Sequence, residues 1–129
     1  MATITEDYVS FETAKLLKEK GFDEKCRTYY KVFPESRIAA IYHSSENRGV
    51  SEDDTNEILC PTLQMTMKWL REVHNLHIWI GHAAGRCLSW YYEIHGISDG
   101  KVKHIGGIQC ASYEVACETA VKYCLENLI

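Results

Sequence analysis

The sequence predicts an α+β fold, with an antiparallel sheet of about five strands and three helices packed on one of its faces. Three observations lead to this prediction. Apolar side chains follow a helical period at the end of the chain, they alternate with polar ones in its middle, and the extended segments are joined by connections of hairpin length. We expect the order αββαβββα and a single domain over residues 1–129.

The clearest element is a helix over residues 112–129. Ser112 is a favourable N-cap, because its hydroxyl can accept a hydrogen bond from a free amide of the first turn. One face of this segment is charged or polar, with Glu118 and Lys122 at the favourable i,i+4 spacing. The opposite stripe is apolar and should be buried. It comprises Tyr113, Ala116, Cys117, Ala120, Val121, Cys124, Leu125 and Leu128.

Two earlier helices have equally local signals. The first should begin after the N-cap Ser10 and end at Gly21-Phe22, a pair typical of a Schellman motif. Its inward residues are Phe11, Ala14 and Leu17. The second should begin at Pro61, where a missing amide costs nothing. Its predicted buried stripe is Leu63, Met67, Leu70 and Val73, with Trp69 at the margin.

Five segments are predicted as strands from their β-branched and aromatic content and their alternation. They are residues 28–33, 37–43, 77–82, 88–95 and 102–108. Gly106-Gly107 suits a β-bulge in the last of them. Residues 44–59 show no period and are rich in Ser, Asn, Glu and Asp, so we expect a long loop there.

The composition is that of an ordinary globular protein with a slight acidic excess. The chain has 14 Lys or Arg and 18 Asp or Glu, a net charge of −4, and no basic run. We therefore expect neither duplex nucleic acid nor a membrane as a partner. The acidic residues 52–54 and Glu57 are typical of a solvated loop. No leader segment or long apolar span is present, so a cytoplasmic protein is expected.

Cysteine and histidine raise the question of metal or covalent chemistry. The six cysteines should be reduced in the cytoplasm, and no Cys-x-x-Cys pair is present. His74 and His77 would span a helix end, so no metal site is predicted. Cys87, which follows Arg86 and lies near His82, is the one candidate nucleophile, although a turn cysteine is the more ordinary interpretation.

Three stretches of the chain share a pattern with one group of proteins. They are Trp69-Leu70-Arg71-Glu72-Val73-His74-Asn75 with His77-Ile78, the ending over residues 112–129, and the opening helix over residues 11–24. These stretches resemble small uncharacterised proteins of phages and prophages of gut bacteria. The resemblance implies a phage or prophage accessory protein of α+β fold and implies no catalytic residues. Residues 81–87 lie outside the shared pattern.

A ligand site is predicted around the segment of residues 81–87. Gly81 and Gly85 could let backbone amides approach an anion that Arg86 grips through two hydrogen bonds, with His82 nearby. Strand aromatics could stack on a planar ligand. Alternation requires that either Tyr91 or its neighbours Trp90 and Tyr92 face away from the helices, together with one of Tyr29 and Tyr30. The predicted ligand-binding set is Trp79, Gly81, His82, Gly85, Arg86, Trp90 and Tyr91.

We expect a non-enzymatic phage accessory binding protein that needs no cofactor and acts as a small oligomer in the bacterial host. In this interpretation it sequesters a small anionic ligand, such as a nucleotide-type immune signalling molecule of the host. Two alternatives stay open. One is a protein that docks on a host enzyme and inhibits it, and the other is a small hydrolase that uses Cys87 and His82.

Overall fold

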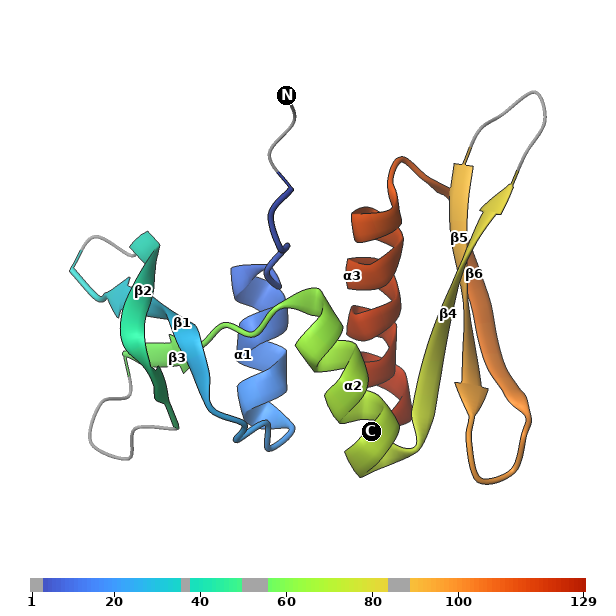
Figure 1. The fold of residues 1–129 in the computed structure, drawn as a ribbon, viewed down its shortest axis with the longest axis horizontal. Helices are drawn as coiled ribbons and strands as arrows, with labels where there is room; N and C mark the ends of the chain where they lie inside the picture. The colour runs from blue at the N-terminus through green and yellow to red at the C-terminus, as the bar shows by residue number, and fades with distance from the viewer. Residues whose placement is uncertain (1–3, 36–37, 50–55, 84–88) are drawn as a thin grey trace. The chain divides into compact units, whose positions relative to one another are not determined.

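The computed structural model describes residues 4–35, 38–49, 56–83 and 89–129, and it divides into two compact units, residues 1–62 and 63–129 (Figure 1). Each unit has its own three-stranded antiparallel sheet. The α+β class is confirmed, but the strands do not form one sheet of about five, because strand pairing depends on contacts distant in sequence. A single domain over residues 1–129 stays a prediction.

The first unit begins with helix α1 (Phe11–Glu19), and local hydrogen bonds fix both of its ends. The Ser10 hydroxyl accepts a hydrogen bond from a first-turn amide at 3.2 Å. At the other end, Gly21 has a φ of 87°, and the amides of Gly21 and Phe22 donate to carbonyls of the last turn. These are the hydrogen bonds of a Schellman motif, so both predicted ends are confirmed.

The sheet of the first unit has the order β2-β1-β3. Its strands are β1 (Cys26–Phe33), β2 (Ile38–Arg48) and β3 (Glu57–Leu59). The Phe11 ring of α1 meets the Tyr30 ring of β1 edge-on at 5.4 Å, and the Tyr30 hydroxyl donates to the Val9 carbonyl at 3.0 Å. Tyr30 therefore faces the helix, and its neighbour Tyr29 faces the other way, where it stacks on Tyr42 at 5.8 Å.

The predicted loop over residues 44–59 is partly wrong. Strand β2 continues to Arg48, and residues 57–59 form β3 on the other edge of β1. Polar side chains can stay in water on an edge strand, so their presence did not exclude extended structure. Pairing with β1 keeps the short strand β3 extended, because its three residues are too few to show an alternation of polar and apolar side chains. Residues 50–55, with the acidic residues 52–54, lie outside the described part.

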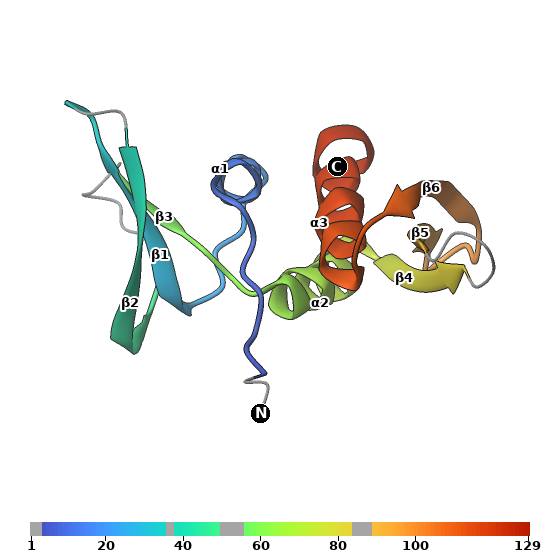
Figure 2. The same ribbon diagram turned by 90° about the horizontal axis from the view of Figure 1, so that it is seen from above.

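The second unit places two helices on one face of its sheet (Figures 1 and 2). The helices are α2 (Leu63–His74) and α3 (Tyr113–Tyr123), and the latter continues as the π-helical turn η1 (Cys124–Leu128). The strands are β4 (Leu76–Ala83), β5 (Ser89–Gly96) and β6 (Val102–Cys110), in the order β4-β5-β6.

The C-terminal helix forms the core of the second unit. The Ser112 hydroxyl accepts a hydrogen bond from the Val115 amide at 3.1 Å, so the predicted N-cap is confirmed. Most of the predicted stripe is completely buried, and Tyr113 and Leu128 at its two ends are half-buried. The completely buried residues are Ala116, Cys117, Ala120, Val121, Cys124 and Leu125.

The predicted stripe of α2 needs two corrections. Trp69 was expected at the margin, but it is 5% exposed and belongs to the core, while Val73 was expected inside and is 54% exposed. The buried stripe is therefore wider in the middle of the helix, and it ends one turn earlier than the sequence period suggests. Leu63, Met67 and Leu70 are buried as predicted.

The bulge predicted at Gly106-Gly107 is confirmed. The β5–β6 register shifts between Trp90 and Tyr92, and Gly107 has a φ of 68°. A Cβ atom at either glycine would meet the Tyr92 ring within 3 Å, so the glycines leave room for a buried tyrosine. None of the helices in the described ranges is long and apolar enough to cross a membrane.

Candidate functional site

The face of the β4-β5-β6 sheet that points away from α2 and α3 is called the outer face below. Residues directly opposite one another in an antiparallel ladder share a face. The register pairs Trp79 with Glu93 and Gly81 with Tyr91, and it continues across β5 to β6. Among the described residues, the outer face thereby includes His77, Trp79, Gly81, Tyr91, Glu93, His95, Val102 and Ile105.

This face presents apolar surface to solvent. Trp79 is 43% exposed, Val102 54% and Ile105 53%, and they come from both edge strands of the sheet. Single exposed apolar side chains are common on any protein, but a group of them on one face is typical of a binding surface. Trp79 is the aromatic member of this exposed group, and Val102 and Ile105 are aliphatic.

Trp79 and Tyr91 form an edge-to-face pair in the middle of the outer face. Their ring centroids are 5.6 Å apart, and the ring planes make an angle of 71°. The Tyr91 ring lies over Gly81, where any Cβ atom would collide with it. Gly81 thus has a structural role that differs from the anion contact expected from the sequence: it lets the tyrosine lie against the sheet beside Trp79.

Ionisable side chains lie beside this aromatic pair. Glu93 Oε2 is 2.9 Å from His95 Nε2, and the His77 and His95 rings are 6.2 Å apart across the ladder. Partial burial lowers the pKa of His77, and the nearby charges of Arg71 and His95 lower it further. The neutral form of His77 is therefore favoured at neutral pH.

The other predicted site residues do not gather on this face. His82 and Trp90 pair with one another on the helix-facing side, with ring centroids 4.5 Å apart. Trp90 also meets the Tyr113 ring of α3 edge-on at 5.7 Å, which makes it part of the packing between sheet and helix. Gly85, Arg86 and Cys87 lie outside the described residues, in the connection between β4 and β5.

A second aromatic group on the helix-facing side was not predicted. The His104 ring stacks on the Tyr123 ring at 3.7 Å with an interplanar angle of 4°, and Tyr92 lies 5.7 Å from His104. Burial raises the pKa of Tyr92, and the adjacent thiols of Cys110 and Cys124 raise it further. These residues come from β5, β6 and the C-terminal helix, so no sequence spacing could have shown that they meet.

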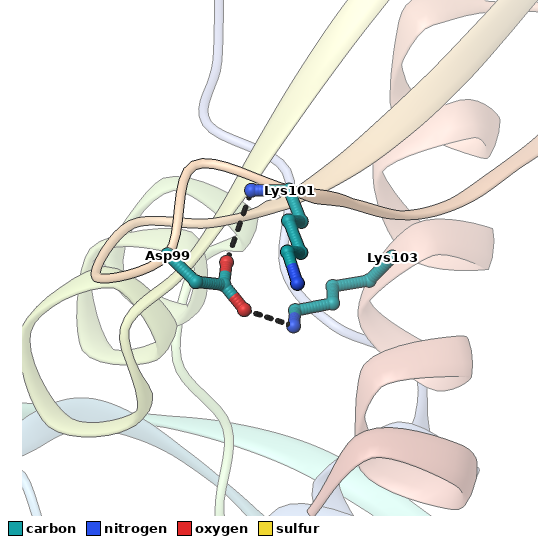
Figure 3. A network of polar contacts seen from close by, with 3 residues as sticks. All are labelled: Asp99, Lys101 and Lys103. Carbon is teal, nitrogen blue, oxygen red and sulfur yellow. Dashed lines mark hydrogen bonds and ion pairs between the residues drawn. The ribbon is translucent and has the colours of Figure 1, made fainter.

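A polar network closes the β5–β6 turn at the end of the sheet (Figure 3). The Asp99 carboxylate accepts hydrogen bonds from the Lys101 amide at 3.0 Å and from the Lys103 ammonium at 2.5 Å. These two bonds lower the pKa of Asp99. A Cβ atom at Gly96 would meet the end of the Asp99 side chain, which would then have to shift. The network gives the polar groups of this turn hydrogen-bond partners within the turn itself, so its role is structural.

The cysteines of the described part are buried and form no disulfide with one another: Cys26, Cys60, Cys110, Cys117 and Cys124. Burial raises the pKa of Cys26 to about 11 and that of Cys124 to about 12. Such thiols are not nucleophiles at neutral pH, because the reactive thiolate is scarcely populated. Within the described ranges, His, Cys, Asp and Glu form no group of three that could hold a metal ion.

Comparison of the chain with protein-family models, with curated proteins and with solved structures found no match.

Proposed function

We propose that this chain is a non-enzymatic accessory binding protein that acts in the bacterial cytoplasm by docking its outer face on another protein. The exposed group of Trp79, Val102 and Ile105 on one face of a three-stranded sheet is the observation that supports this proposal best. Burial of such surface against a partner is favourable by about 25 cal/mol per Å² of apolar area before the costs of association are subtracted.

The exposure of the site favours a protein partner over catalysis. Trp79, Val102 and Ile105 leave about half of their surface in water, whereas catalytic groups work best in a concave site that excludes water. Aromatic residues are enriched in protein interfaces, and polar groups such as Glu93 and His95 are ordinary at the rim of one. The described thiols are buried, and burial raises the pKa values of Cys26 and Cys124. These thiols therefore give no support to a catalytic cysteine in the described part of the chain.

The test compares two lysine substitutions at positions of nearly equal exposure. Ile105 on the outer face is 53% exposed, and Val73 on α2 is 54% exposed. Tagged parent, Ile105→Lys and Val73→Lys proteins are used to capture partners from bacterial lysate, and their melting temperatures are compared. A protein retained by the parent and by Val73→Lys but lost from Ile105→Lys supports the proposal. Equal retention by all three contradicts it.

A nucleotide-type ligand is a second candidate, as expected for a protein that sequesters a host signalling molecule. It is favoured by the Trp79–Tyr91 pair, since aromatic rings stack on bases, and by the place of Arg86 in the β4–β5 connection that adjoins this pair in the chain. A ligand that binds only the native state raises the melting temperature by mass action. Thermal shifts with a panel of cyclic and linear nucleotides, repeated for Arg86→Ala, test this candidate.

A further inference from the structure

We propose that Trp79, Tyr91 and Glu93 form a subsite for a cationic side chain of the partner, a guanidinium or an alkylammonium group. This inference rests on the proposed function, because it names the chemistry that the outer face would recognise. It concerns a corner of the face formed by two rings and one carboxylate, which lie on adjacent strands.

Two aromatic rings, those of Trp79 and Tyr91, form two sides of the proposed subsite. The Trp79 and Tyr91 ring planes make an angle of 71°, and Gly81 leaves room for the Tyr91 ring beside β4. Trp79 keeps 43% of its surface exposed, so it is open to an incoming group. A cation within about 6 Å of a ring centroid is attracted by the negative face of the ring, and tryptophan is the strongest partner.

The carboxylate completes the recognition of positive charge. Glu93 lies directly opposite Trp79 in the ladder, where Cβ atoms are typically about 5 Å apart. One of the Glu93 carboxylate oxygens is hydrogen-bonded to His95, and the Glu93 side chain is 27% exposed. A carboxylate has two oxygens that together accept about four hydrogen bonds, so Glu93 can also accept from an incoming ammonium or guanidinium.

Charge complementarity favours a cation over the other occupants of such a surface. The outer-face residues named above, all within the described part of the chain, include one carboxylate and two histidines but no Lys or Arg, and the nearby charge of Arg71 acts on His77. The whole chain has a net charge of −4. An anionic group would be repelled by Glu93, and an aliphatic group would leave the carboxylate without a new partner while displacing its water.

The probes for this subsite are N-acetyl-arginine amide and its neutral isostere N-acetyl-citrulline amide. They differ in charge and are nearly equal in size. Titration is followed by proton–nitrogen NMR of the full chain, using the Trp79 indole and the amides of β4 and β5. We expect a saturable shift with the arginine probe in the millimolar range and an affinity for the citrulline probe that is at least tenfold lower.

Two variants assign the effect to the corner. Glu93→Gln keeps the size of the side chain and should weaken arginine binding by about tenfold. Val73→Ala, on α2, should leave it unchanged, and the spectra themselves report whether each variant is folded. Equal binding of the two probes, no binding of either, or unchanged binding by Glu93→Gln overturns the inference. The capture experiment with Ile105→Lys decides separately whether the outer face docks on a protein.

Discussion

At the scale of single residues, the addition of one methyl group at Gly81 should disturb the aromatic pair of the outer face. The space that a side chain would fill is already occupied by the Tyr91 ring. Tyr91 in turn holds the edge-to-face contact with Trp79. The arrangement of the aromatic pair therefore depends on the absence of one Cβ atom.

Gly81→Ala should destabilise the protein by about 1–3 kcal/mol, because the Tyr91 ring must leave its place on β4. Denaturant unfolding measures this change. Gly49→Ala is the matched control, since its nearest neighbour would be Lys25 at 3.9 Å, and it should be nearly neutral. In a Tyr91→Ala background the cost of Gly81→Ala should largely disappear. An equal cost in both backgrounds would show that the ring is not what the methyl group displaces.

His77 should titrate below its ordinary pKa of about 6.5, because partial burial and the nearby Arg71 and His95 disfavour its charged form. Since the folded pKa is lowered, the unfolded chain binds more protons between the two pKa values. Stability contributed by neutral His77 is therefore present above the unfolded pKa and is lost as the pH falls through about 6.5 toward the folded pKa.

Histidine NMR titration checks this prediction directly. Replacement of Arg71 by glutamine should move the His77 midpoint upward, because one source of repulsion is removed. The lowered pKa would be contradicted by a parent midpoint at or above 6.5, and the role of Arg71 by a midpoint that Arg71→Gln does not change.

Cys26 and Cys124 should react slowly with iodoacetamide in the folded protein at pH 8. Their pKa values of about 11 and 12 leave little thiolate, and both side chains are buried. We expect alkylation at least about tenfold slower than in urea, measured by peptide mass spectrometry.

The denatured, unreduced chain should carry six adducts, one for each cysteine in the sequence. Two protected thiols in that sample would indicate a disulfide and contradict the reducing compartment.

At the scale of elements, the C-terminal helix has the largest completely buried stripe of the second unit. Leu125→Ala should lower the free energy of unfolding by about 2–5 kcal/mol through lost transfer energy and the cavity left behind. Leu128→Ala is the internal comparison, because that side chain is half-buried and should cost less. Denaturant midpoints compare the two, and equal losses would show that position 125 is not in the core.

The first and last helices could be predicted from the sequence because their signals are local. The start of the second helix, predicted at Pro61, was wrong, since α2 begins at Leu63 and Thr62 forms a β-bridge with Tyr8. The caps at Ser10 and Ser112 and the stop at Gly21 depend on residues within one turn, and all three are confirmed. Strand β3 could not be predicted in the same way. It has three residues, and its extended form is held by hydrogen bonds to β1, far away in sequence. The burial of Trp69 likewise depends on packing and not on helical period.

At the scale of the whole chain, the sequence predicted the class of the fold but not the division of its strands between two sheets. The same limit applies to the candidate site. Alternation predicted that Tyr91 and Trp90 lie on opposite faces of β5, and this is confirmed. Which of them faces away from the helices depends on the contact of Trp90 with Tyr113, which no local pattern contains. The predicted ligand-binding set was therefore divided between the two faces.

We propose that the outer face of the β4-β5-β6 sheet is the surface that binds the partner. Calorimetric titration of a purified, captured partner against the parent, Ile105→Lys and Val73→Lys measures the contribution of this face to binding. We expect Ile105→Lys to weaken binding by at least about tenfold, because it removes apolar contact surface and places an ammonium group opposite Glu93, where it competes with a cationic group of the partner. Val73→Lys should bind like the parent. Binding that is unchanged in Ile105→Lys, or weakened equally in both variants, would contradict the proposal.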